Sequence, residues 1–254
     1  MSFKLRVERA AHEKKSNIIL ALDPSVGSSH HLLKQSTRIL EEVIPHICGL
    51  KINRQLVLPL GLFNGTQKIL RLAQEEGLPT IMDCKINDVG YTNRAIADYY
   101  FKAGFDAVVA NPFVGWIDGL QPVFEVAKST DRGVILLVYM SHKGAPEGYG
   151  QTIQNPKTHN YTPQYVAFAE KALTWKADGA VVGATYPEKI EEIHSILKDN
   201  VPIFSPGVGA QGGDIEKAMK AGARYLIVGR AITLSKDPAE AAERIRNIAQ
   251  EHSK

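Results

Sequence analysis

Short runs of consecutive apolar residues recur along the chain, and segments with helical periodicity separate them. The runs are rich in β-branched residues and are apolar at successive rather than alternate positions, which is typical of parallel strands buried on both faces. They predict eight strands, at 17–23, 47–52, 79–84, 106–111, 133–140, 179–184, 202–207 and 225–230. The intervening segments predict helices, among them 31–44, 65–77, 93–104, 163–175, 187–197 and 213–223.

Strand and helix patterns alternate eight times along the 254 residues. This order predicts a (β/α)8 TIM barrel that forms a single α/β domain over residues 1–254, because a doubly wound sheet usually has fewer strands or a second domain. No low-complexity stretch or linker divides the chain. We expect Gly77, Gly104, Gly179 and Gly222 to end helices, since each follows a helical run and leads into a strand.

Composition and charge limit the binding partners and the cellular location that we expect. The formal net charge is only +3, and the lysines and arginines are scattered, so we expect no nucleic-acid partner, while anionic small molecules remain possible. The first twenty residues lack the apolar core of a secretory signal, and no apolar run is long enough to span a bilayer, so we expect a cytoplasmic protein with no membrane partner. Cys48 and Cys84 lie in apolar segments without metal-ligand spacing and should be reduced core residues.

Charged residues stand at the ends of the first three predicted strands. Asp23 ends the first strand, Lys51 ends the second, and Asp83 and Lys85 end the third, with Asp88 just beyond. Asp83 and Lys85 are two apart on what should be an extended segment, so their side chains should share one face. Strand ends of a barrel meet at one rim, where buried charges are costly unless paired. The sequence therefore predicts an alternating ionic network in the barrel mouth.

Glycines gather after the last two strands. The segment "PGVGAQGGD" (206–214) follows the seventh strand and resembles a loop whose backbone N–H groups bind an anion. Gln211 lies within it, and Arg230 follows the eighth strand, where many barrels hold a phosphate. Arginine is well shaped for bidentate contacts to phosphate, so these two loops are predicted to bind a phosphate group.

The segment "DCKINDVGYT" (83–92) resembles the D-x-K-x-x-D-[IV] signature of the orotidine 5′-monophosphate decarboxylase family. The resemblance extends over nearly the whole chain, through "ALD", "GLKIN", "MSHKGA", "SPGVGAQGG" and "IVGRAI" at successive strand ends. It implies decarboxylation of orotidine 5′-monophosphate to UMP in pyrimidine biosynthesis. It also implies that the reaction needs no cofactor and no metal, and that the enzyme is a homodimer with shared active sites.

The resemblance also implies a role for each matched residue. Lys85 would stabilise the carbanion at C6 and then protonate it, and Asp83 would lie beside the departing carboxylate. Asp23 and Lys51 would contact the ribose hydroxyls, with Lys51 also part of the catalytic set. Asp88 is the fourth catalytic residue and would reach into the partner's site.

The remaining matched residues would bind substrate. Ser141 would hydrogen-bond the pyrimidine, and Thr92 would stand behind Asp88 at the partner's site. Gln211, Gly229 and Arg230 would hold the 5′-phosphate, and Pro206 would line the pocket nearby.

The chain departs from the family pattern in the segment 142–161, which lies within an insertion (141–163) where Gly, Pro, Asn and Thr cluster. This segment is longer than in compact members and carries Lys143 where proline is expected, which affects the lid over the pyrimidine. We expect an irregular loop there, and loops of this length are more often functional than idle. Val89, where isoleucine is frequent, is a mild change.

Three other functions are compatible with the fold. A magnesium-dependent sugar-phosphate decarboxylase or aldolase shares the D-x-K-x-x-D pattern, but such relatives are expected to place an acidic ligand where this chain has Lys51, and a lysine repels a divalent cation. A Schiff-base aldolase would need a neutral lysine, whereas flanking carboxylates favour the charged form. A non-catalytic nucleotide-binding barrel would need only the two phosphate loops.

Overall fold

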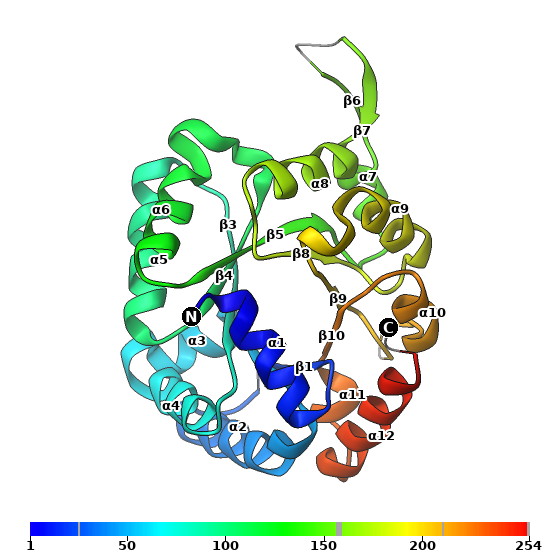
Figure 1. Cartoon of the computed structure of the whole chain (residues 1–254). Helices are drawn as coiled ribbons and strands as arrows, with labels where there is room; N and C mark the ends of the chain where they lie inside the picture. Colours follow the sequence, from blue (N-terminus) through cyan, green and yellow to red (C-terminus); the bar gives the residue numbers. More distant parts are fainter. Residues whose placement is uncertain (25, 156–158, 210, 253–254) are drawn as a thin grey trace.

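Eight parallel strands close into one barrel in a computed structural model that describes residues 1–24, 26–155, 159–209 and 211–252. Around the barrel the strands follow the order β1-β10-β9-β8-β5-β4-β3-β2 (Figure 1). The single (β/α)8 barrel is thus confirmed. The strands are β1 (Ile18–Leu22), β2 (Gly49–Asn53), β3 (Thr80–Ile86), β4 (Ala107–Ala110), β5 (Gly133–Tyr139), β8 (Gly179–Val182), β9 (Ile203–Pro206) and β10 (Tyr225–Val228).

Helices form a ring outside the barrel (Figure 1). Their apolar faces pack on the outward side chains of the strands and bury the larger part of the core. The helices of the described residues are α1 (Phe3–Lys14), which lies across one end of the barrel, and α2 (Ser29–Val43), α3 (Arg54–Leu60), α4 (Gln67–Glu75), α5 (Gly90–Ala103), α6 (Gln121–Ser129), α7 (Ala145–Tyr149), α8 (Gln164–Thr174), α9 (Pro187–Leu197), α10 (Ile215–Lys220), α11 (Arg230–Thr233) and α12 (Pro238–Glu251). Short helical turns cover Ile44–His46, Gly61–Thr66, Pro112–Val114, Trp116–Leu120 and Lys198–Asn200.

Helix α1 closes the N-terminal end of the barrel, a role that the apolar pattern did not predict. Phe3 and Val7 are buried and join the cluster of side chains that fills the barrel interior. The approach is close, since a Cβ atom added to Gly133 would lie 2.6 Å from the Phe3 ring. Because this end is plugged, the opposite end, where the strands finish, is the open one.

Three of the four predicted helix-ending glycines do end helices. Gly77, Gly104 and Gly222 have φ values of 71°, 116° and 112°, the left-handed region in which glycine carries no steric penalty. The prediction for Gly179 is wrong, because it opens β8 and Lys176 takes the left-handed conformation after α8. Gly179 instead leaves room for the Phe204 ring, into which a Cβ atom would run.

The insertion 141–163 is not the irregular loop that its composition predicts. It contains α7 and an antiparallel hairpin of β6 (Thr152–Gln154) and β7 (Tyr161–Pro163), which extends beyond the ring of helices (Figure 1). The side chains of β6 and β7 are exposed or half-buried, so these strands contain no apolar run from which the sequence could predict them. Residues 156–158 lie outside the described part of the chain.

The cysteine prediction is confirmed. Cys48 and Cys84 are both buried and unpaired, and burial raises the pKa of the Cys84 thiol to about 12. No helix within the described residues is both long and apolar enough to cross a membrane.

Candidate active site

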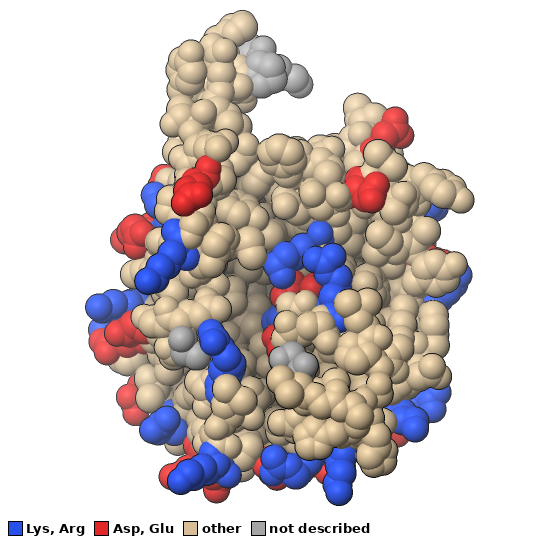
Figure 2. All heavy atoms as spheres, turned by 180° about the vertical axis from the view of Figure 1, so that it is seen from behind, with Lys and Arg blue, Asp and Glu red and all other residues tan. Residues whose placement is uncertain are grey.

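A cavity of about 700 Å³ opens at the end of the barrel where the strands finish. Figure 2 shows this face, with lysine or arginine and acidic side chains gathered in its central hollow. The cavity has an apolar floor of inward-facing strand residues and a polar rim. All the predicted site residues except Asp88 and Thr92 line it, namely Asp23, Lys51, Asp83, Lys85, Ser141, Pro206, Gln211, Gly229 and Arg230.

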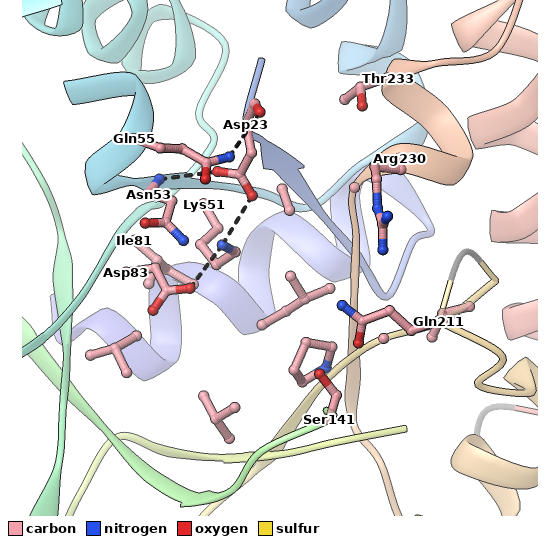
Figure 3. A pocket seen from close by; sticks show the side chains of 18 of the residues that line it. Asp23, Lys51, Asn53, Gln55, Ile81, Asp83, Ser141, Gln211, Arg230 and Thr233 are labelled. Carbon is pink, nitrogen blue, oxygen red and sulfur yellow. Dashed lines mark hydrogen bonds and ion pairs between the residues drawn. The ribbon is translucent and has the colours of Figure 1, made fainter. Parts of the chain in front are cut away.

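Asp83 lies between two lysines. Its Oδ2 atom is 2.9 Å from Lys51 Nζ, and its Oδ1 atom is 2.6 Å from Lys85 Nζ. Lys51 is also 3.5 Å from Asp23 Oδ2 (Figure 3). The pairing of β1, β2 and β3 brings these residues together, since Ala21 aligns with Lys51 and Asn53 with Asp83. The predicted alternating network is therefore present.

Burial and pairing act against each other on the ionisation of this network. Burial raises the pKa of Asp83, but Lys51 and Lys85 outweigh it and hold that pKa at about 2. Burial likewise lowers the pKa of Lys51, yet Asp83 and Asp23 outweigh it and the net shift is upward. The charged forms of Asp83 and Lys51 are therefore the stable ones at neutral pH.

The backbone geometry that brings Lys85 next to Asp83 differs from the predicted one. The pairing of β3 with β4 shifts between Met82 and Ile86, which marks a bulge, and Lys85 itself has a φ of 49°. A lysine in the left-handed region is strained, and such strain persists where the surrounding structure over-determines it. The two side chains meet across this bulge and not by simple alternation along an extended strand.

The predicted phosphate residues lie across the cavity from the ionic network. Figure 3 shows Gln211 and Arg230 on the side opposite Asp83, with Ser141 near Gln211. Gly207, with a φ of 98°, permits this approach, since a Cβ atom there would lie 2.9 Å from Ser141 Cβ and 3.0 Å from Gln211 Oε1. The ionic network and the predicted phosphate residues thus lie on opposite sides of the same cavity.

Five further polar side chains among the described residues line the cavity without having been predicted as site residues, namely His31, Gln35, Asn53, Gln55 and Thr233. The Asn53 backbone N–H donates to Asp23 Oδ1 at 3.2 Å, and Gln55 Nε2 donates to the Asp23 carbonyl at 3.0 Å. Asn53 is the last residue of the "GLKIN" segment, and this motif is the sequence feature that could have identified it as a site residue. Gln55 and Thr233 belong to no motif.

Asp88 and Thr92 are not brought into this cavity. Asp88 is exposed, and its Oδ1 atom accepts a hydrogen bond of 2.7 Å from the Val89 backbone at the start of α5. Apolar side chains are exposed nearby on the same segment, with Val89 at 64% and Tyr91 at 88% exposure. Asp88 therefore lies at the surface of the chain, outside the cavity.

The donor set around the cavity is a poor match to a divalent cation. Asp83 contacts Lys51 and Lys85, and Asp23 contacts Lys51, so ammonium groups occupy the positions a cation would take. Within the residues described, no group of three or more His, Cys, Asp or Glu side chains is arranged to hold a metal ion.

Comparisons with known proteins agree with one another. The sequence model of the orotidine 5′-phosphate decarboxylase / HUMPS family matches residues 16–245. The orotidine 5′-phosphate decarboxylase of Thermococcus kodakarensis is 37% identical over 91% of this chain and 96% of its own length. The crystal structure of the Pyrococcus horikoshii enzyme is similar with a TM-score of 0.75 and 36% identity, covering 92% of this chain and 99% of its own. That of the Methanocaldococcus jannaschii enzyme, complexed with the inhibitor BMP, has a TM-score of 0.78 and 30% identity, covering 92% and 98%.

We expect Asp83→Asn to lower stability at pH 7 by about 3 kcal/mol, because two ammonium groups lose the carboxylate they share. The pKa of Asp83 is held at about 2, below its ordinary 3.8, so the stability it supplies is present above pH 3.8 and is lost as the pH falls through 2. Urea unfolding of both proteins at about pH 7, 5 and 3 should show a full difference at the first two values and a smaller one at the third.

The matched control is Glu125→Gln, which breaks the exposed 3.1 Å pair with Arg94. This change should cost less than about 1 kcal/mol at each pH. Equal losses in the two variants would contradict the network's role in stability.

Proposed function

The chain belongs to the orotidine 5′-phosphate decarboxylase / HUMPS family and is a carboxy-lyase that converts orotidine 5′-monophosphate to UMP in pyrimidine biosynthesis, and we propose that Lys85 carries the chemical step. The observation behind this assignment is the short ion pair between Lys85 Nζ and Asp83 Oδ1 at the cavity wall. It fixes an ammonium group where the reacting carbon of a bound nucleotide can lie.

The chemistry requires such a group. Loss of CO₂ from the vinylic C6 carbon leaves a localised carbanion, so a fixed cation placed where this charge develops lowers the barrier. Lys85 then donates an ammonium proton to C6, which gives UMP and a neutral amine that is reprotonated from solvent. Asp83, whose pKa of about 2 keeps it ionised, holds Lys85 in place and repels the substrate carboxylate that leaves.

The rest of the substrate is matched to the two ends of the cavity. Gln211, Gly229 and Arg230 hold the 5′-phosphate, and Asp23 and Lys51 hold the ribose hydroxyls. Ser141 hydrogen-bonds the pyrimidine, and Pro206 lines the wall beside it. Phosphate binding far from C6 contributes to catalysis when its binding energy orders the site around the reacting carbon.

The proposal includes a homodimer in which Asp88 and Thr92 complete the partner's site. The exposure of Asp88 and of the apolar residues Val89 and Tyr91 beside it supports this arrangement, since apolar surface next to a functional group is typical of an interface. We also propose a cytoplasmic location, which the two unpaired buried cysteines support.

Turnover of orotidine 5′-monophosphate in excess EDTA tests the function. We expect the fall in orotate absorbance to proceed at the same rate with and without the chelator, because Lys51 and Lys85 supply the cationic charge. A rate that collapses in EDTA and returns with magnesium would contradict the metal-free mechanism. Binding of UMP without any turnover would support the non-catalytic barrel.

Lys85→Ala tests the chemical assignment. We expect kcat to fall by at least about 10⁴-fold, because both the fixed cation and the proton donor are removed, while calorimetry still detects UMP binding. Lys102→Ala, which breaks an exposed pair with Asp98 on α5, is the matched control and should retain wild-type turnover. Near-normal turnover by Lys85→Ala would refute the assignment.

Mixing two inactive proteins tests the shared site. Lys85→Ala and Asp88→Asn subunits, allowed to exchange, should recover about a quarter of wild-type activity, because half of the dimers are mixed and each mixed dimer has one intact site. Lys85→Ala mixed with Asp83→Asn is the control and should recover none, since those two residues belong to the same subunit's site. No recovery in the first mixture, with exchange verified, would place Asp88 in its own subunit's site.

A further inference from the structure

We propose that Gln55 is a positioning residue that sets the affinity of the site for the ribose hydroxyls, by fixing the Asp23 main chain so that the Asp23 carboxylate faces the sugar. This inference rests on the proposed function, which gives Asp23 the ribose. Gln55 lies in the first turn of α3, lines the cavity and belongs to no motif of the chain.

Asp23 lies just beyond the regular part of the sheet. The pairing of β1 with β2 ends at Leu22 and Ile52, so the backbone of Asp23 is outside the ladder that fixes the strand. Pro24 follows it and has no N–H group to donate. The position of Asp23 therefore depends on contacts made by groups other than the ladder.

The segment from Asn53 to Gln55 supplies two such contacts, one at each end of the residue. The Asn53 N–H donates to the Asp23 carboxylate at 3.2 Å, and the Gln55 amide donates to the Asp23 carbonyl at 3.0 Å (Figure 3). A carboxylate held by one bond can still swing with its backbone, whereas bonds to both the carboxylate and the carbonyl fix its direction. Gln55 thus provides the second point of attachment.

Asp23 needs this support more than Asp83 does. Its contacts to Lys51 and Asn53 are 3.5 and 3.2 Å long, whereas those of Asp83 to Lys51 and Lys85 are 2.9 and 2.6 Å. The Asp23 side chain is also more exposed, at 25% against 14%. The weaker the hold of the ionic network on a carboxylate, the more its direction depends on the main chain.

The test compares wild type with Gln55→Met, which keeps the length of the side chain and loses the donor, and with Gln55→Glu, which places an acceptor against the carbonyl. Calorimetry measures the binding of UMP, 2′-deoxy-UMP and 3′-deoxy-UMP to each protein. We expect UMP to bind about fivefold more weakly to both variants, the loss expected for one hydrogen bond. At least one deoxy analogue should bind wild type and variants equally, because it lacks the ribose hydroxyl that contacts the Asp23 carboxylate.

Two controls separate positioning from a general structural effect. Gln74→Met removes a similar bond, from Gln74 Nε2 to the Gly104 carbonyl at 2.9 Å, away from the cavity, and should leave all three affinities unchanged. In an Asp23→Ala background, Gln55→Met should have no further effect on UMP binding. The kcat of Gln55→Met should stay near wild type while its KM rises.

Each unfavourable outcome has a distinct meaning. Unchanged UMP affinity in both Gln55 variants, or equal weakening of UMP and both deoxy analogues, would overturn the role of Gln55 while wild-type turnover still supports the decarboxylase. Absence of wild-type turnover on orotidine 5′-monophosphate would overturn the proposed function itself, whatever the Gln55 variants bind.

Discussion

The Asp83 carboxylate, placed between Lys51 and Lys85, is the interaction on which the rest of the site depends. Lys51 is almost fully buried, with 6% of its side chain exposed, and an unpaired ammonium there would be too costly to keep charged. Asp83 compensates for this cost and at the same time fixes Lys85 at the cavity wall. One carboxylate thus stabilises the buried Lys51 and positions the half-buried Lys85, so the arrangement of both lysines depends on it.

The barrel makes this arrangement possible because it excludes water from the inner side of the ionic network. Helix α1 and Phe3 close the far end, and the interior between them and the cavity is filled with apolar side chains. Water is therefore kept to one side of the network, and in such surroundings each ionic contact is stronger than it would be in open solvent. This explains how the two lysines hold the pKa of Asp83 at about 2 although burial raises it.

The sequence predicts the barrel and the charged rim because both depend on local patterns, namely apolar runs and the residues that end them. Prediction from the sequence fails where a structural feature depends on contacts between segments that are distant along the chain. Phe3 plugs the barrel through its contact with Gly133, and Gly179 is required by Phe204, and neither need is visible in the local sequence. The bulge at Lys85 is not predicted for the same reason, since the local pattern indicates only an extended strand. Gln55 carries no motif and is found only by its bond to Asp23.

The charge balance of the cavity gives the outward position of Asp88 a physical meaning. Among the described residues of one subunit, the network joins the carboxylates of Asp23 and Asp83 to the ammonium groups of Lys51 and Lys85, so it is neutral by itself. In the proposed homodimer, Asp88 of the partner subunit would add a third carboxylate, which would make the network negative and further compensate the ammonium charges at the cavity wall. The proposed assembly would then be coupled to chemistry through charge, because each site would take one of its carboxylates from the other subunit.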